Sequence, residues 1–294
     1  MSIYISNSLF LSSTFGSGDF NPNNPIIGYH SVLTPDDISA PVSASIRPAI
    51  NAWSPDTSLV WEGEPYTGAS ATITQFLVLD NTTTASVDYV GIARHNFGSE
   101  GYTYTIQSSD DGGTTWIDRS TPKIVSGDDA IIEFFDARVS ALFRIKIEKT
   151  ATEVAAPIIG HVKLGQALVL QRRIYAGHQP AALAKSVKKT TYGSESGQYL
   201  GQVVHRSYRK TSLQQENNSP DFVREKIVPF INHVNGHNVV DNTAPATFFF
   251  SWRPSDYPDE VIYGWTPDNI MPENQGGDSM GGRMSWSMDI EAIA

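Results

Sequence analysis

The chain has 294 residues, of which 40% are hydrophobic and 18% are charged, so it can build a core and is not a largely disordered protein. It has no cysteine, which excludes disulfide bonds and thiolate metal sites, and its formal net charge of −10 argues against nucleic-acid binding. No apolar run is as long as a membrane span, and the N-terminus lacks the basic and apolar regions of a signal peptide. We therefore expect no membrane span and no secretory export.

Residues 1–35 are rich in Asn, Ser, Gly and Pro. The segment "SIYIS" predicts a short strand, whereas "GSGDFNPNNP" predicts a loop because Gly, Asn and Pro favour turns. We expect an N-terminal arm or strand here, and the sequence leaves open which sheet it joins.

Residues 36–162 contain short runs of β-branched and aromatic residues that alternate with turn residues. The runs are "LVWEG", "TITQFLVLD", "VDYVGIARH", "YTYTIQSSD", "TTWIDR", "AIIEFFDA" and "ALFRIKIEK". In "FRIKIEK", Phe143, Ile145 and Ile147 alternate with charged residues, which is typical of a strand with one buried face. The pattern predicts an antiparallel β-sandwich.

The segment "SSDDGGTTW" in this region fits S-x-D-x-G-x-T-W, the Asp-box of sialidases and related propellers. Asp111 can accept hydrogen bonds from its own turn, Gly112 and Gly113 allow positive φ, and Trp116 can fold back as an apolar anchor. A propeller would repeat the motif in each blade, but the chain has one copy. We therefore predict a structural hairpin turn and no sialidase activity.

The order of these elements resembles the discoidin-like, galactose-binding-like jelly roll. The resemblance lies in "ISAPVSASIRPAINAWSPDTSLVWEG", in "YTYTIQSSDDGGTTW" and in "ALFRIKIEK", and it covers roughly residues 36–162. It implies a jelly-roll sandwich of the kind that includes carbohydrate-binding modules.

Aromatic side chains near predicted loops make this sandwich a candidate sugar-binding module, because sugars stack on exposed rings. The candidates are Trp61, Tyr66, Phe97 and Tyr102. A core position is the alternative for Trp61, Phe97 and Tyr102, and the discoidin pattern places a core tryptophan where Trp61 lies.

Residues 163–294 form a second predicted β domain. We expect strands in "QALVLQRRIY", "ATFFFSWRP", "VIYGWTP" and "RMSWSMDIEAIA", and a long strand or a pair in "GQYLGQVVHRSYRKTSLQQEN". The segment "SPDFVREKIVPFINHVNG" predicts the one helix, at about residues 219–235, with Ser219 as N-cap and Pro220 at the first helical position. Pro229 should bend or interrupt it.

This second region resembles the distal tail, or tail-tip, proteins of long-tailed bacteriophages. The resemblance rests on "GSESGQYLGQVVHRS", "FVREKIVPFINH", "FFFSWRPSDYPDEVIYGW" and "MSWSMDIEAI", within about residues 165–294. It implies a tail-tube-like β domain, a homo-oligomeric ring, by family a hexamer, and contacts with tube, hub and fibre proteins. The implied location is the virion tail tip, assembled in the host cytoplasm.

The charge is unevenly distributed. Residues 163–210 contain nine Lys and Arg and one acid, a net charge of +8, so the remainder of a chain with total charge −10 carries −18. We predict that opposite charges meet across a head-to-tail subunit contact in a ring. The predicted interface residues are Arg172, Arg173, Lys188, Lys189, Arg206 and Arg209 on the basic side and Asp256, Asp259, Glu260 and Asp268 on the acidic side.

We predict no enzyme, cofactor or metal. No serine lies on a nucleophile elbow, no Walker lysine follows a glycine-rich loop, and a zinc face at His233 and His237 is disfavoured because Gly236 ends the helix between them. Three functions remain: a ring-forming virion protein, a carbohydrate-binding adhesin module that contacts the host surface, and, as the least favoured, a glycoside hydrolase.

Overall fold

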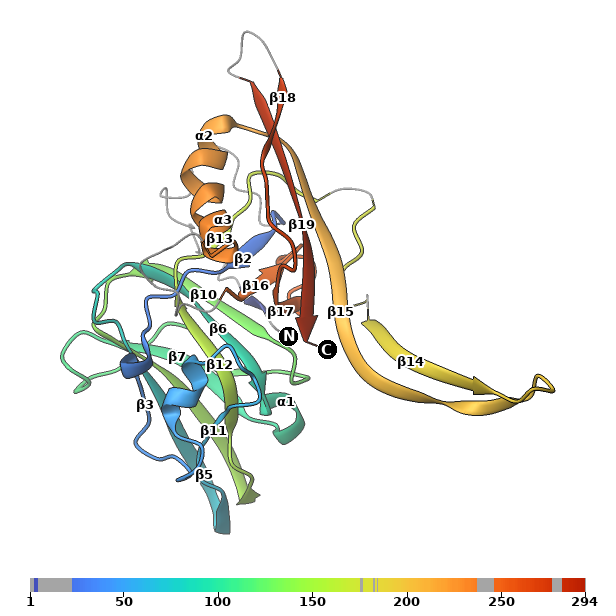
Figure 1. Ribbon diagram of the computed structural model, residues 1–294. Helices are drawn as coiled ribbons and strands as arrows, with labels where there is room; N and C mark the ends of the chain where they lie inside the picture. The colour runs from blue at the N-terminus through green and yellow to red at the C-terminus, as the bar shows by residue number, and fades with distance from the viewer. Residues whose placement is uncertain are drawn as a thin grey trace.

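The computed structural model describes residues 3–4, 23–174, 177–181, 183, 185–236, 246–276 and 282–293 (Figure 1). The protein is mainly β, with a two-sheet sandwich and a third sheet that carries one helical segment and a long projecting hairpin. We name the three sheets the outer sheet, the inner sheet and the arm sheet, in the order in which their faces pack.

The inner sheet of the sandwich has the strand order β1–β10–β6–β12–β4. Its strands are β1 (Ile3–Tyr4), β4 (Trp61–Glu62), β6 (Val87–His95), β10 (Ile131–Arg138) and β12 (Ile158–Gly165). All neighbours are antiparallel except β1, which pairs in parallel with β10.

The outer sheet has the order β3–β5–β11–β7–β8, and β9 also pairs with β7. Its strands are β3 (Ile38–Ser39), β5 (Tyr66–Asp80), β7 (Thr103–Ser109), β8 (Ile117–Asp118), β9 (Lys123–Ile124) and β11 (Leu142–Val154), and the short helices η2 (Pro35–Asp37), η3 (Ala49–Trp53) and α1 (Phe97–Glu100) lie in the connections. Phe143, Ile145 and Ile147 are buried between the sheets while the charged residues between them face outward, which confirms the predicted alternation. Each run predicted as a strand in the sandwich contains one.

The arm sheet has the order β13–β2–β16–β17–β19–β15–β14, and β18 also pairs with β19. Its strands are β2 (Ile26–Gly28), β13 (Leu168–Val169), β14 (Lys185–Gly193), β15 (Tyr199–Asn218), β16 (Phe248–Ser251), β17 (Val261–Trp265), β18 (Glu273–Gly276) and β19 (Arg283–Ile293). The alternatives left open for the long basic segment are resolved as one long strand, β15, whose first half pairs with β14.

The predicted helix is present as α2 (Pro220–Phe222), the π-helical η4 (Val223–Ile227) and α3 (Val228–Val234). The Ser219 hydroxyl accepts a hydrogen bond from the Phe222 amide at 3.3 Å, which confirms the N-cap. Pro229 does not end the helix. It follows the wider π turn, which accommodates the missing proline N–H, and the helix continues.

Both faces of the arm sheet are buried near β16, where three consecutive phenylalanines alternate between two cores. Phe248 and Phe250 face the helix, in a cluster that includes Phe230 and Ile290. Phe249 faces the sandwich, and it packs with residues of the inner sheet. Because side chains alternate along a strand, one apolar run serves two interfaces.

The contact between the arm sheet and the inner sheet is a core of its own, shared by both halves of the chain. It includes Ile26, Tyr89, Ile132, Phe134, Phe249, Val261 and Tyr263. The predicted boundary at residue 162 therefore runs through an apolar interface. A fragment of residues 36–162 would expose the outer faces of β6 and β10 to water.

The N-terminal region does not form a separate arm in its described parts. β1 extends the edge of the inner sheet, and β2 lies within the arm sheet between β13 and β16. The predicted loop "GSGDFNPNNP" lies almost entirely outside the described residues.

A buried lysine also joins the two halves. Lys163 on β12 donates hydrogen bonds to the carbonyl oxygens of Tyr29, at 3.1 Å, and Thr247. Burial lowers the pKa of Lys163 to about 7. The buried Lys163 side chain thus provides hydrogen-bond donors for two backbone carbonyl oxygens between the inner sheet and the arm sheet.

We predict that Gly91→Ala will separate these layers, since a Cβ at Gly91 would lie 2.5 Å from the Phe249 ring. Forcing an extra methyl into a packed core costs about 1–3 kcal/mol. Urea unfolding followed by tryptophan fluorescence should show this loss as one transition for both halves. Gly127→Ala is the matched control, because its Cβ would meet nothing within 4 Å. Equal effects of the two substitutions would contradict the close packing.

Candidate functional site

The β14–β15 hairpin, here called the arm, projects from the body of the molecule (Figure 1). The first half of β15 pairs with β14 from Gly193↔Tyr199 to Lys185↔Arg209, whereas β19 pairs only with Tyr208 onward. Residues 199–207 therefore have one strand edge with no partner among the described residues. Free edges of this kind can pair with strands of another chain.

The outer part of the arm, which is β14 with residues 199–207 of β15, is exposed on both faces. Its apolar side chains are at least 43% exposed, and they are Val187, Tyr192, Tyr199, Leu200, Val203 and Val204. No core cluster of the described chain includes any of them. The outer part of the arm thus exposes six apolar side chains on one hairpin.

The arm carries like charges directly opposite one another. Lys188 on β14 faces Arg206 on β15, and Lys185 faces Arg209. Like charges in opposite positions destabilise a strand pair unless an acid lies near. Arg209 has such an acid, since it forms an ion pair with Asp129 of the sandwich at 2.7 Å. In the described part of the chain, Lys188 and Arg206 form no ion pair.

The predicted interface residues therefore divide into several groups. Lys188, Lys189 and Arg206 lie on the arm, whereas Arg209 anchors the base of the arm to the sandwich. Arg172 and Arg173 line a pocket beside that base. The predicted basic residues thus lie on the arm and at its base, and Arg209 has a partner within the chain.

The predicted acidic residues lie around the β16–β17 and β17–β18 connections. Asp256 is 3.8 Å from Arg253, and Glu260 accepts a hydrogen bond from the Trp252 indole. Asp259 and Asp268 are exposed. Glu260 therefore has an internal partner, which the sequence pattern did not indicate.

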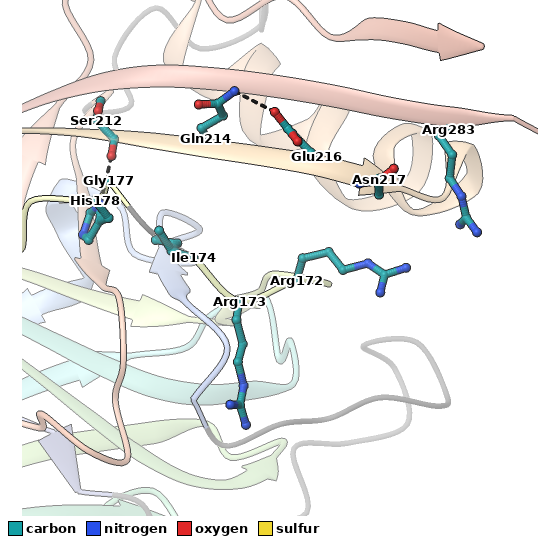
Figure 2. A pocket seen from close by; sticks show the side chains of 10 residues that line it. All are labelled: Arg172, Arg173, Ile174, Gly177, His178, Ser212, Gln214, Glu216, Asn217 and Arg283. Atoms are coloured by element: carbon teal, nitrogen blue, oxygen red, sulfur yellow. Dashed lines mark hydrogen bonds between the residues drawn. The ribbon is translucent and has the colours of Figure 1, made fainter. Parts of the chain in front are cut away.

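The pocket beside the base of the arm has a volume of about 600 Å³. The chain after β13 crosses β15 here. The side-chain amide of Gln215 donates a hydrogen bond to the Arg172 carbonyl oxygen at 3.1 Å, and His178 Nδ1 lies 3.0 Å from the Ser212 carbonyl oxygen. Three arginines line the space, and the lining residues are Arg172, Arg173, Ile174, Gly177, His178, Ser212, Gln214, Glu216, Asn217 and Arg283 (Figure 2). Arg283 was not among the predicted site residues.

The Asp-box forms the predicted hairpin turn between β7 and β8. Asp111 accepts hydrogen bonds from the Thr115 amide at 2.9 Å, the Thr115 hydroxyl at 2.6 Å and the Ser109 hydroxyl at 2.7 Å. Gly112 and Gly113 both have positive φ. All these contacts lie within the turn, so the motif acts in folding.

The four predicted sugar contacts do not form an exposed cluster. Trp61, Phe97 and Tyr102 are at most 2% exposed and belong to the sandwich core, and the Trp61 indole donates to the Ser43 hydroxyl at 3.0 Å. Tyr66 is partly exposed, and its hydroxyl donates to the Ala69 carbonyl at 2.9 Å. A buried ring has no face for a sugar, so the core alternative describes the first three positions.

A different aromatic cluster lies on the outward face of the outer sheet. The Arg144 guanidinium lies between two partly exposed rings, 4.0 Å from the centroids of both Phe76 and Trp116. Gln107 accepts from Arg144 at 2.6 Å and donates to Asp118 at 2.6 Å. The Trp116 ring is thus only half-buried, and it packs on the Arg144 guanidinium.

The described residues contain no group of three His, Asp or Glu side chains that could hold a metal ion. His233 lies against the Tyr29 ring at 5.4 Å, and His237 is outside the described residues. No helix in the described part of the chain has the length and apolarity to cross a membrane.

Comparison with known proteins gives similarity to solved structures alone, because no family model matches the chain and no curated protein matches it. Chitosan-binding module 1 of a chitosanase/glucanase from Paenibacillus sp. IK-5 is 18% identical, covers 46% of this chain and 98% of its own, and has a TM-score of 0.38. The family 32 module of AlyQ, in complex with 4,5-unsaturated mannuronic acid, is 17% identical over 47% and 96%, with a TM-score of 0.35. The family 32 module of C. perfringens NanJ, in complex with galactose, is 13% identical over 48% and 98%, also at 0.35. At these identities and TM-scores, the similarity does not indicate what this chain binds.

We predict that Asp111 stabilises the fold above about pH 4 and loses this effect near pH 2. Its hydrogen bonds, first from the Thr115 hydroxyl, lower its pKa from 3.8 to about 2. A carboxylate with a depressed pKa in the folded state contributes stability above its unfolded pKa and loses it as pH falls through the folded value. The difference in melting temperature between the natural chain and Asp111→Asn should therefore shrink from pH 4 to pH 2.

The exposed Asp136 provides the control, because no hydrogen bond to its side chain is described. Asp136→Asn should leave the melting curve nearly unchanged throughout this range. If the difference in melting temperature between the natural chain and Asp111→Asn stays constant from pH 4 to pH 2, the ionised Asp111 carboxylate does not stabilise the turn.

Proposed function

We propose that the chain is a non-catalytic structural subunit of an oligomer whose contacts are made by the arm. The observation that carries the proposal is the two-stranded ribbon formed by β14 and the first half of β15, exposed on both faces and unpaired along one edge of β15. An isolated two-stranded ribbon is marginally stable in water. A neighbouring chain that covers its apolar side chains and completes its edge would stabilise it.

A second copy of the chain is the partner that fits best. The region that contains the arm has a net charge of +8, and the remainder has −18, so a copy offers acidic surface to a basic arm. The facing Lys188 and Arg206 would then be stabilised by acids of that copy. Repeated head-to-tail, such a contact closes into a ring.

The resemblance of residues 165–294 to distal tail proteins supports a location for this ring. We propose the tail tip of a long-tailed bacteriophage, where the ring would join the tail tube to the hub, fibres or other host-recognition parts. A hexamer is the ring size that this resemblance implies.

Substitution of the arm should abolish assembly and leave the subunit folded. Leu200 and Val204 are 64% and 55% exposed, so Leu200→Asp with Val204→Asp should change the melting temperature of the monomer little. In an oligomer the same positions are covered, and buried unpaired carboxylates are strongly unfavourable. Mass photometry of the purified chain should show an oligomer for the natural sequence and a monomer for the variant.

Ile46→Asp is the matched control, because Ile46 is 83% exposed but lies on the sandwich, away from the arm. It should leave the oligomer intact. Lys188→Glu with Lys189→Glu should weaken the oligomer most at low salt, where charges are least screened. A natural chain that stays monomeric at all concentrations would exclude the proposed assembly.

We propose as a second function that the sandwich binds a carbohydrate at the host surface. The solved structures named above are carbohydrate-binding modules, which matches this function rather than a tail role. The observation in this chain that favours it is the Phe76–Arg144–Trp116 stack, with Gln107 and Asp118 beside it on an outward sheet face. Ring faces beside amide and carboxylate groups suit a sugar that has both apolar and hydroxyl surfaces.

Affinity electrophoresis of the full chain in gels that contain polysaccharides tests this second function. Trp116→Ala should weaken retention roughly tenfold or more, as for an aromatic hot spot. Ile124→Ala, which changes a 66% exposed residue of the same sheet, should leave retention unchanged. Equal retention of the two variants would exclude a sugar site at the stack.

A further inference from the structure

The pocket beside the base of the arm belongs to neither proposed function. It lies on the arm sheet, and its lining residues share none of the stack residues on the outer sheet. Its volume of about 600 Å³ is in the range of small-molecule sites. It is therefore a separate place where a ligand could bind.

Among the described residues, the pocket has an excess of positive charge that no ion pair neutralises. Arg172, Arg173 and Arg283 line it, with Glu216 as the one acid among the described lining residues. Within the described ranges none of the three arginines forms an ion pair, and Arg172 Nε is buried with no hydrogen-bond acceptor. The terminal N–H groups of the three guanidinium groups can donate hydrogen bonds to an oxyanion in the pocket.

The other end of the pocket is neutral and can bind hydroxyl groups. Figure 2 shows the guanidinium groups of Arg172 and Arg283 toward one end and His178 and Ser212 toward the other. His178 Nδ1 lies 3.0 Å from the Ser212 carbonyl, which can only accept, so Nδ1 carries the proton and Nε2 of the neutral ring is an acceptor. His178 Nε2 is also buried without a partner, and burial lowers the pKa of His178, which favours this neutral ring.

We propose that this pocket binds a uronate, a sugar acid whose carboxylate lies against Arg172 and Arg283 and whose hydroxyl groups face His178 and Glu216. A guanidinium pairs with a carboxylate through two parallel hydrogen bonds. Glu216 already accepts from Gln214 at 2.9 Å, and its charge would repel the carboxylate of the ligand toward the arginines while it accepts from a hydroxyl. A bare phosphate would satisfy the arginines but lacks the ring and the ring hydroxyl groups that face His178 and Glu216 in a bound uronate.

Calorimetric titration of the full chain with glucuronate tests the site. We expect binding at millimolar concentrations, with no comparable binding of glucose, which lacks the carboxylate, or of phosphate and succinate, which lack the sugar ring and its hydroxyl groups. Absence of glucuronate binding, or equal binding of glucose, phosphate or succinate, would overturn the proposal.

Substitutions of the pocket arginines test whether glucuronate binds at this pocket. Arg172→Gln and Arg283→Gln should each weaken glucuronate binding about tenfold or more, the effect of losing a hydrogen bond to a charged group. Arg283→Lys should also weaken binding, because lysine keeps the positive charge but lacks the two parallel N–H groups with which a guanidinium binds a carboxylate. Arg224→Gln, at an exposed helical position, is the matched control and should bind like the natural chain.

Circular dichroism melting of each variant shows whether the fold is kept. Unchanged binding in both Arg172→Gln and Arg283→Gln with an intact fold would overturn the assignment. Trp116→Ala should retain glucuronate binding, which separates this site from the sugar site proposed on the sandwich.

Discussion

The packing of Phe249 over Gly91 determines how the molecule is arranged. A residue with a side chain at position 91 would meet the phenyl ring, so the close approach of the inner sheet and the arm sheet depends on this glycine. The approach in turn buries Tyr89, Ile132 and Tyr263 and places the carbonyl oxygens of Tyr29 and Thr247 within reach of Lys163. The ion pair between Arg209 and Asp129 crosses the same junction and holds the base of the arm against the sandwich.

The parts of the fold that could be predicted from the sequence are those that depend on neighbours along the chain. Strand alternation in "FRIKIEK", the turn made by Asp111, and the helix cap at Ser219 involve residues a few positions apart, so their patterns are local. The "FFF" run predicted a strand, but not that its faces enter two different cores, because the inner-sheet residues of the second core lie more than a hundred positions earlier.

The candidate sites were less predictable because they depend on contacts between distant residues. Phe97 and Tyr102 lie near a predicted loop, where exposed side chains are expected, yet they fold into the core. Arg144 stacks between Phe76 and Trp116, which come from different strands. The pocket combines Arg172 with Arg283, which lies more than a hundred positions later in the chain and was not among the predicted site residues.

The packed junction would have a consequence for the proposed assembly through the arm. The outer sheet is the layer farthest from the arm sheet (Figure 1), so contacts made at the arm sheet would leave the face that carries Trp116 uncovered. In a closed ring, symmetry would repeat this face once per subunit at a fixed spacing and tilt. A surface with many identical receptors would then be bound multivalently, and the effective concentration created by the first contact would turn weak individual binding into strong attachment.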